Sequence, residues 1–231
     1  MRQLPLAFGP RPPQTFDSYL ARANAPAVAH LQALSLPAAP VYLWGPAGSG
    51  KTHLLHALIL AAQERGERAG WFSAQAPLPF EFDDTWSLIV IDDADALDAP
   101  RQHGAFTLFV EAMTHGVQLV AAGRMPPVDL PVRDDLRTRL GWGHVFALQP
   151  LGESEARAVL RREADRRGIF LSDEVMDYVL SRFSRDLKNL MGLLDRLDDF
   201  ALAEQRAVTV PLLKLMLAHE RPLAAAEGGQ A

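Results

Sequence analysis

The sequence predicts an α/β fold in which a parallel-sheet base, residues 15–150, is followed by a small all-helical domain, residues 151–221. Short apolar runs alternate with helical patterns as far as Pro150, which is typical of a parallel sheet covered by helices. Beyond residue 153 only helical patterns follow. A chain of 231 residues is long enough for two such domains.

Apolar runs predict the strands of the base, and segments with helical periodicity separate them. Four or more consecutive apolar residues suit a parallel strand that is buried on both faces. A short helical stretch at 26–35 precedes the first strand. We expect strands at Val41–Trp44, Ala69–Ser73, Leu88–Ile91, Val117–Ala122 and His144–Leu148, with helices at about 50–65 and 101–115.

In the helical domain, apolar residues recur at the spacing of one helix face, so we interpret them as core rather than as a cofactor site. They are Leu187, Leu190, Met191, Leu194 and Leu197, and Ser184 is placed to cap their helix. The two ends of the chain differ from this pattern. Residues 1–14 are rich in proline and predict an extended arm, whereas the small, polar residues 222–231 predict a disordered tail.

Composition excludes several classes of function. The chain has no cysteine, which excludes disulfides and thiolate zinc sites and fits a reducing compartment. No apolar run is long enough to span a membrane and no signal peptide is evident, so we expect a cytoplasmic protein without a membrane partner. The net charge of −5 disfavours direct binding of duplex DNA, which usually requires a basic excess.

A phosphate-binding loop is the most specific motif in the chain. Residues 45–52 fit the pattern G-x-x-x-x-G-K-[ST], with a predicted strand before them and a helical pattern after them. These flanks disfavour a glycine-rich turn without a ligand. Backbone N–H groups and the helix N-terminus would face phosphate oxygens, Lys51 the β- and γ-phosphates, and Thr52 a Mg²⁺ ion. The predicted nucleotide-binding residues are Gly45, Pro46, Ala47, Gly48, Ser49, Gly50, Lys51 and Thr52.

Two aspartates follow the apolar run at 88–91 and complete the predicted site. An apolar strand that ends in aspartate is common and is usually structural, but some 40 residues after a phosphate loop it becomes specific. We expect Asp92 to hold Mg²⁺ through water and Asp93 to orient the attacking water. Asp95 and Asp98 are expected to face solvent.

Three segments resemble the AAA+ ATPase domain of the bacterial initiator DnaA, and the similarity runs from about residue 14 to 219. The run Gly50–Ala57 is similar to the family's phosphate loop, and Thr15–Tyr19 to its linker near the adenine. Residues 140–143, after Arg137 and Arg139, resemble the segment with the arginine finger. The resemblance implies an AAA+ fold whose helical domain is a lid, and it implies ADP or ATP with Mg²⁺ as the ligand.

The resemblance also implies roles for single residues. Phe16 would lie near the adenine, Arg139 would act in trans as an arginine finger, and Arg185 would contact phosphate from the lid. The alternative for both arginines is a solvated surface position. His53 and His56, three residues apart on a helix, are interpreted as packed rather than metal-binding. Gly123 occupies a position where the family usually has a polar sensor residue, so we expect slow hydrolysis by this chain itself.

Two features resemble the regulatory branch of that family rather than the initiator. The initiator's C-terminal DNA-binding domain is not expected, and the arm carries Gln3, Leu4, Leu6 and Phe8, similar to a peptide that binds the sliding clamp, the β subunit of DNA polymerase III. The implied function is a clamp-tethered, homo-oligomeric regulator that stimulates ATP hydrolysis by DnaA, limits initiation and meets DNA only indirectly. The alternatives are an independent AAA+ ATPase of helicase-loader type and a nucleotide-gated clamp adaptor without finger chemistry.

Overall fold

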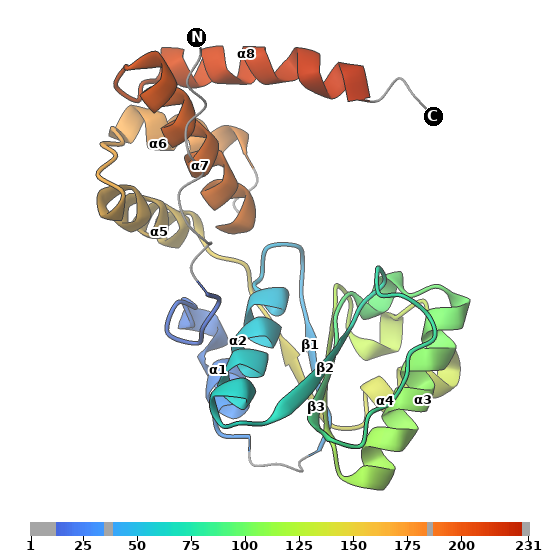
Figure 1. Cartoon of the computed structure of the whole chain (residues 1–231). Helices are drawn as coiled ribbons and strands as arrows, with labels where there is room; N and C mark the ends of the chain where they lie inside the picture. The colour runs from blue at the N-terminus through green and yellow to red at the C-terminus, as the bar shows by residue number, and fades with distance from the viewer. Residues whose placement is uncertain (1–12, 35–38, 184–186, 228–231) are drawn as a thin grey trace. The chain divides into compact units, whose positions relative to one another are not determined.

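A computed structural model describes residues 13–34, 39–183 and 187–227, and the chain divides into two compact units between Pro150 and Leu151. Figure 1 shows the elements of both units, and each unit is described here by itself. Several residues with predicted roles lie outside the described part of the chain. They are Gln3, Leu4, Leu6 and Phe8 of the arm, Ser184 and Arg185, and the side chain of Leu187.

The base is built on a five-stranded parallel sheet with the order β2-β3-β4-β1-β5, which confirms the predicted fold class. Each predicted strand forms; β1 has the predicted bounds, and the ends of the other strands shift by at most two residues. β1 lies between β4 and β5, so the loop that follows it emerges at the carboxyl edge of the sheet between two neighbouring strands. The strands are β1 Val41–Trp44, β2 Arg68–Phe72, β3 Trp86–Ile91, β4 Gln118–Gly123 and β5 His144–Ala147.

Helices cover both faces of this sheet, because successive side chains of its buried strands alternate between two apolar cores (Figure 1). Leu88 and Val90 pack with α1 and α2, whereas Ile89 and Ile91 pack with α3 and α4. Alternation on two buried faces explains why these strands are continuous apolar runs. The elements are η1 Arg22–Asn24, α1 Ala25–Gln32, α2 Lys51–Glu64, η2 Ala94–Ala96, α3 Ala99–His115, η3 Pro127–Asp129 and α4 Asp134–Leu140.

The lid contains four helices around a core of its own: α5 Glu153–Arg166, α6 Asp173–Arg182, α7 Leu187–Glu204 and α8 Val210–Glu227. Leu190, Leu194 and Leu197 are buried in that core and Met191 packs against it, as the helical spacing predicts. The predicted tail begins too early, since α8 continues to Glu227. The alanines in this stretch have high helix propensity, which outweighs their small size.

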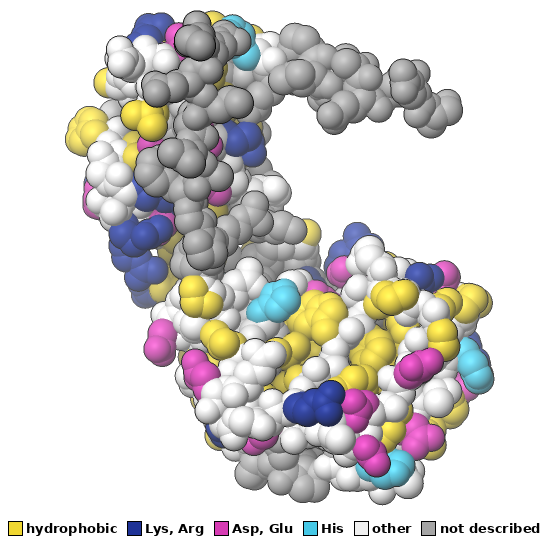
Figure 2. Space-filling view, viewed as in Figure 1, with side chains coloured by type: hydrophobic (Ala, Val, Ile, Leu, Met, Phe, Trp, Pro, Cys, Tyr) yellow, Lys and Arg dark blue, Asp and Glu magenta, His cyan; other side chains and the backbone are white. Residues whose placement is uncertain are grey.

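The distribution of charged side chains on the surface is consistent with the net negative charge of the chain. On the face of the base seen in Figure 2, Lys and Arg side chains are scattered among hydrophobic and acidic ones. Within the described residues, no helix is both long and apolar enough to cross a bilayer.

Candidate nucleotide-binding site

The predicted phosphate loop connects β1 to α2 at the carboxyl edge of the sheet. Gly48 and Gly50 have φ values of +78° and +89°, in the left-handed region that glycine adopts at little cost. Gly50 also faces the ring of Tyr19, since a Cβ built on it would lie 2.4 Å from a ring carbon. Because α2 begins at Lys51, the N-terminal end of that helix adjoins the loop. This end has the free N–H groups and the partial positive charge that bind phosphate.

Lys51 is buried, and its ammonium group is held by the loop itself. Its Nζ donates to the carbonyl oxygens of Gly45 at 2.7 Å and Pro46 at 3.0 Å. Burial lowers the pKa of Lys51, while the charges of Asp92, Asp95 and Asp93 raise it and that of Arg124 lowers it. A buried cation beside four charged groups, without a direct ion pair among the described residues, fits a site for a polyanionic ligand.

Asp92 and Thr52 are in direct contact beside the loop. Asp92 is 4% exposed, and its Oδ2 accepts a 2.7 Å hydrogen bond from Thr52 Oγ1. Burial raises the pKa of Asp92, and the hydrogen bond from Thr52 opposes that shift. Hydroxyl and carboxylate oxygens are ligands that Mg²⁺ accepts, directly or through water, so this pair fits the ion that accompanies a nucleotide.

Asp93 begins the short helix η2 with an uncommon backbone conformation. Its φ of +51° lies in the left-handed region, which costs a residue with a Cβ about 1–2 kcal/mol. Its N–H donates to Asp92 Oδ1 at 2.9 Å, which fixes one carboxylate against the next residue. The left-handed turn thus holds both aspartates at the end of β3.

The prediction that Asp95 faces solvent is wrong. Its side chain is only 2% exposed, and its carboxylate accepts the backbone N–H of Arg124 at 2.8 Å and the Nε of Arg124 at 2.7 Å. The first turn after Asp93 points this carboxylate under the end of β4, where it needs a partner. Asp98, by contrast, has a 53% exposed side chain and caps α3 by accepting the N–H of Arg101.

The space beside Gly123, where the resemblance implies a polar sensor side chain, is occupied by the side chain of Tyr42. A Cβ built on Gly123 would lie 2.2 Å from Tyr42 Oη and 3.1 Å from Asp95 Oδ1. The Tyr42 hydroxyl donates to the Met125 carbonyl at 3.0 Å, and burial, followed by the charge of Asp95, raises its pKa. Sequence analysis missed Tyr42, although a tyrosine in an apolar strand needs a hydrogen-bond partner, and that requirement was the available signal.

The linker before α1 is fastened to the phosphate loop by contacts that sequence analysis missed. Tyr19 donates from its hydroxyl to the Ser49 carbonyl at 3.0 Å and accepts from Asn24 Nδ2 at 2.8 Å. Asn24 also forms two hydrogen bonds with the backbone of Gln149, at 2.9 and 2.8 Å. His53 Nε2 lies 2.9 Å from the Thr15 carbonyl oxygen. A change in the conformation of the phosphate loop would therefore disturb the contacts that hold the linker.

The aromatic and histidine residues of this region are packed. Phe16 is partly buried against the core between α1, α2 and the sheet. His56 stacks on Trp71 with ring centroids 4.4 Å apart, while His53 faces the linker. Within the described residues no group of three side chains is suited to hold a metal ion. Packing thus accounts for both histidines.

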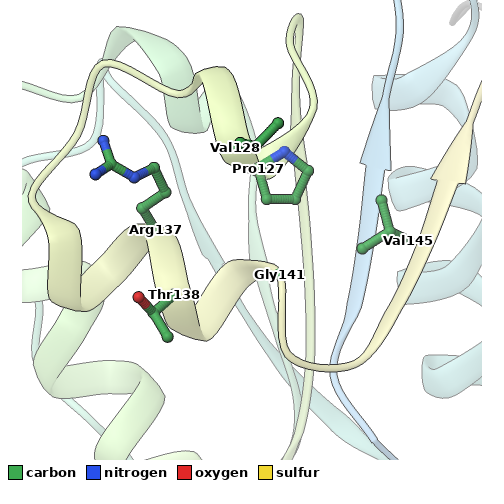
Figure 3. Close-up of a pocket in the computed structure, with 6 residues that line it drawn as sticks. All are labelled: Pro127, Val128, Arg137, Thr138, Gly141 and Val145. Carbon is green, nitrogen blue, oxygen red and sulfur yellow. The ribbon is translucent and has the colours of Figure 1, made fainter.

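Arg139 lies in the last turn of α4, and its guanidinium stacks on α3. Its Cζ is 5.6 Å from the ring centroids of both Phe106 and Phe109. The neighbouring Trp142 is 67% exposed. Figure 3 shows the adjoining shallow hollow, with Arg137 and Thr138 on α4, Pro127 and Val128 on η3, and Val145 on β5.

Comparison with known proteins gives matches for both the base and the lid. The family described as "Hda, lid domain" matches residues 153–217. Domain III of the Thermotoga maritima replication initiation protein DnaA superposes with a TM-score of 0.74 at 22% identity, over 91% of this chain and 98% of that domain. A replication initiator DnaA bound to AMPPCP and single-stranded DNA gives a TM-score of 0.67 at 24% identity, over 84% and 68%.

The match also extends to longer proteins. A DNA replication initiation factor superposes with a TM-score of 0.68 at 22% identity over 81% of this chain, and the chain spans 65% of that protein's length. The Thermotoga maritima RuvB Holliday junction branch migration motor gives a TM-score of 0.65 at 16% identity, over 89% of this chain and 72% of RuvB. Together with the phosphate loop and the lid match, these superpositions establish the fold. The chain therefore has the AAA+ fold of DnaA domain III, with an α/β base and a helical lid that matches the family model described as the Hda lid domain.

Proposed function

We propose that this chain is a nucleotide-binding regulator of the Hda type that stimulates ATP hydrolysis by DnaA and so limits initiation of replication. The observation that carries the proposal is the buried Lys51 beside the Thr52–Asp92 pair, in a chain whose residues 153–217 match the Hda lid. The first feature supports nucleotide binding, and the second supports a regulator within the DnaA group.

The proposed ligand is ADP or ATP. DnaA structures bound to AMPPCP superpose on this chain, which supports an adenine nucleotide. Residues 45–52 would hold its phosphates, Phe16 would lie near the adenine, and Arg185 would reach the phosphates from the lid. Thr52 and Asp92 would hold Mg²⁺, which neutralises charge on the β- and γ-phosphates when bound. Asp93 would orient water, with slow hydrolysis by this chain itself.

The proposed partners are DnaA and the sliding clamp. Gln3, Leu4, Leu6 and Phe8 would bind the clamp, which would raise the local concentration of the regulator near DnaA on DNA. Arg139 would act in trans on ATP held by DnaA, where an arginine finger adds about 10³–10⁵ in rate. The exposed Trp142, three residues further on, supports a role of this edge in contacts between subunits.

A second candidate function is a nucleotide-gated clamp adaptor without finger chemistry. The stacking of Arg139 on Phe106 and Phe109 favours it, because a finger must leave these rings to reach a neighbouring nucleotide. Both candidates use the same nucleotide site and the same arm, so they differ in the role of Arg139 alone.

The test is ATP hydrolysis by DnaA in the presence of clamp-loaded DNA, with and without this protein. We expect stimulation by the wild type and its loss in Arg139→Ala. Arg133→Ala is the matched control, since Arg133 also stacks on Phe106, at 5.9 Å, and should retain stimulation. Clamp binding without stimulation would favour the adaptor, and rapid hydrolysis by this protein alone would favour an independent ATPase.

A further inference from the structure

Two histidines of the base face each other across the contact between α1 and β5. His30 lies in the last turn of α1, and His144 is the first residue of β5. Their ring centroids are 4.4 Å apart, and the ring planes meet at an angle of 57°. β5 runs parallel to β1 and begins at the amino edge of the sheet, whereas the phosphate loop follows β1 at the carboxyl edge. The pair is therefore separate from the nucleotide site.

The alternation of side chains along β5 explains why His30 meets two rings. His144 and Phe146 are two residues apart, so they lie on the same face of the strand, and the centroid of the His30 ring is 5.1 Å from that of Phe146. The backbone of His144 is fixed, since its N–H donates to the Pro40 carbonyl at 2.8 Å and the residue pairs with Val41. The helix and the outer strand of the sheet thus hold the two imidazoles in contact.

The Nε2 atom of His30 is the unusual feature of this contact. It is buried and has no hydrogen-bond partner among the described residues. Burying a polar nitrogen without a partner costs free energy, which an apolar ring at this position would avoid. His144, in contrast, is exposed, so its imidazole is accessible to ions in solution. One buried and one accessible imidazole side by side provide the donor atoms that transition metals bind.

The separation of the rings is close to that of two imidazoles bound to one ion. With a metal–nitrogen distance of about 2.0–2.1 Å, the ion lies about 3.2 Å from each ring centroid, so two ligands at about 90–110° place their centroids about 4.5–5.2 Å apart. The observed 4.4 Å is slightly shorter, and a small rotation of the exposed His144 ring is enough to widen it. The chain has no cysteine, so no thiolate competes for such an ion.

We propose that His30 and His144 bind one late first-row divalent metal ion, such as Zn²⁺, Ni²⁺ or Cu²⁺, with water completing its coordination. The ion would link α1 to the outer strand β5. Because no group of three suitable side chains occurs in the described residues, the site has two protein ligands and is an open site, unlike the closed four-ligand sites of structural zinc. Binding should stabilise the folded base, since the unfolded chain does not hold the two imidazoles together.

The competing interpretation is that His30, His144 and Phe146 form only an aromatic cluster. Packing alone predicts that a ring of similar size at residue 30 preserves stability at every metal concentration. A metal site predicts instead that stability rises with metal concentration and that this rise requires both imidazoles. His30→Phe keeps an aromatic ring and removes one ligand, whereas His144→Gln removes the other ligand at an exposed position.

The experiment measures Zn²⁺ binding to the full chain, first stripped of metal with a chelator, by titration calorimetry and by the midpoint of thermal unfolding. The wild type should bind one equivalent saturably and unfold at a higher temperature as Zn²⁺ is added. Loss of an outer-shell partner of a metal ligand already costs about tenfold to a hundredfold in affinity, so His30→Phe and His144→Gln should each weaken binding at least about tenfold. Both variants should also abolish the Zn²⁺-dependent rise of the midpoint.

Electron paramagnetic resonance with Cu²⁺ as the probe counts the bound imidazoles directly. The wild-type spectrum should show nitrogen splitting from two imidazoles, and that of each variant from one at most. The matched control is His219→Gln, because His219 also packs on a phenylalanine, Phe200, at 5.7 Å between ring centroids, with no second histidine ring beside it in the described part of the chain. It should change neither measurement. Unchanged Zn²⁺ affinity in both His30→Phe and His144→Gln, or no Zn²⁺ binding by the wild type, would overturn the inference.

Discussion

The base and the lid bury different kinds of side chains, although each has an apolar core. Among the described residues, every buried polar or charged one belongs to the base: Asn24, Ser49, Lys51, Asp92 and Gln118. The charged groups of the lid instead pair at its surface, as Arg157 does with Asp177 and Arg161 with Asp173. The buried polar groups beside the proposed nucleotide site thus belong to the base, and the described core of the lid serves packing.

The largest expected effect is in the core of the lid. Leu213 on α8 is 0% exposed, so Leu213→Ala should lower the free energy of unfolding by about 2–5 kcal/mol through lost burial and a cavity. Hydrogen exchange should rise at the amides of α7 and α8 but not at those of β4. Leu202→Ala is the control, because Leu202 is 57% exposed and should change little. Equal exchange in β4 would show that the two cores unfold together.

Replacing a glycine by alanine should lower the free energy of unfolding at Gly123 in the base and raise it at Gly192 in the lid. Gly123→Ala in the base forces a Cβ to within 2.2 Å of Tyr42 Oη and should cost about 1–3 kcal/mol. Gly192→Ala in α7 meets nothing closer than 3.7 Å and should add up to about 1 kcal/mol through helix propensity. Thermal unfolding checks both. Adding Tyr42→Phe to Gly123→Ala should recover part of the loss, and a failure to do so would mean that another contact sets the cost.

Replacing the Asp92 carboxylate by a neutral amide should stabilise the fold but weaken nucleotide binding. Burial raises its pKa, so its protonated form stabilises the fold and this contribution is lost as the pH rises through the folded-state pKa. At neutral pH, Asp92→Asn should therefore raise the free energy of unfolding by about 1 kcal/mol. It should also weaken binding of Mg-nucleotide about tenfold. Asp84→Asn, at an exposed aspartate of the base, should change neither quantity, and a destabilised Asp92→Asn would contradict the account.

The smallest effect is expected at the surface of the lid. Hydrogen bonds from Arg166 and Arg167 lower the pKa of Glu163 to about 2, so this carboxylate stabilises the lid above its unfolded pKa. That contribution is lost as the pH falls from about 4.3 toward about 2. Glu163→Gln should remove about 1 kcal/mol or less at pH 7 and flatten the acid limb of stability against pH. An unchanged acid limb would show that other carboxylates control it.

Local patterns in the sequence predicted most of the fold and located the segments that form the candidate site. The strands and the phosphate loop are short segments whose residue types predict their structure. Residues 41–52 and 88–93 could therefore be identified from the sequence alone. The contacts that complete the site join distant residues, such as Tyr42 with Met125 and Asp95 with Arg124. Nothing near Asp95 in the chain marks it as buried, because its partner comes from another strand. The helix end at Glu227 was missed because small residues suit both tail and helix.

The order of strands in the sheet has a consequence for synthesis of the protein. β1 pairs with β4 and β5, which are the last two strands of the base to leave the ribosome. Domains generally fold as units, and pairings between distant segments form slowly. The phosphate loop is translated early, yet neither strand beside it is available until the base is nearly complete. A nascent chain should therefore acquire nucleotide affinity late, so a stalled or truncated base should be unable to compete with the finished protein for nucleotide.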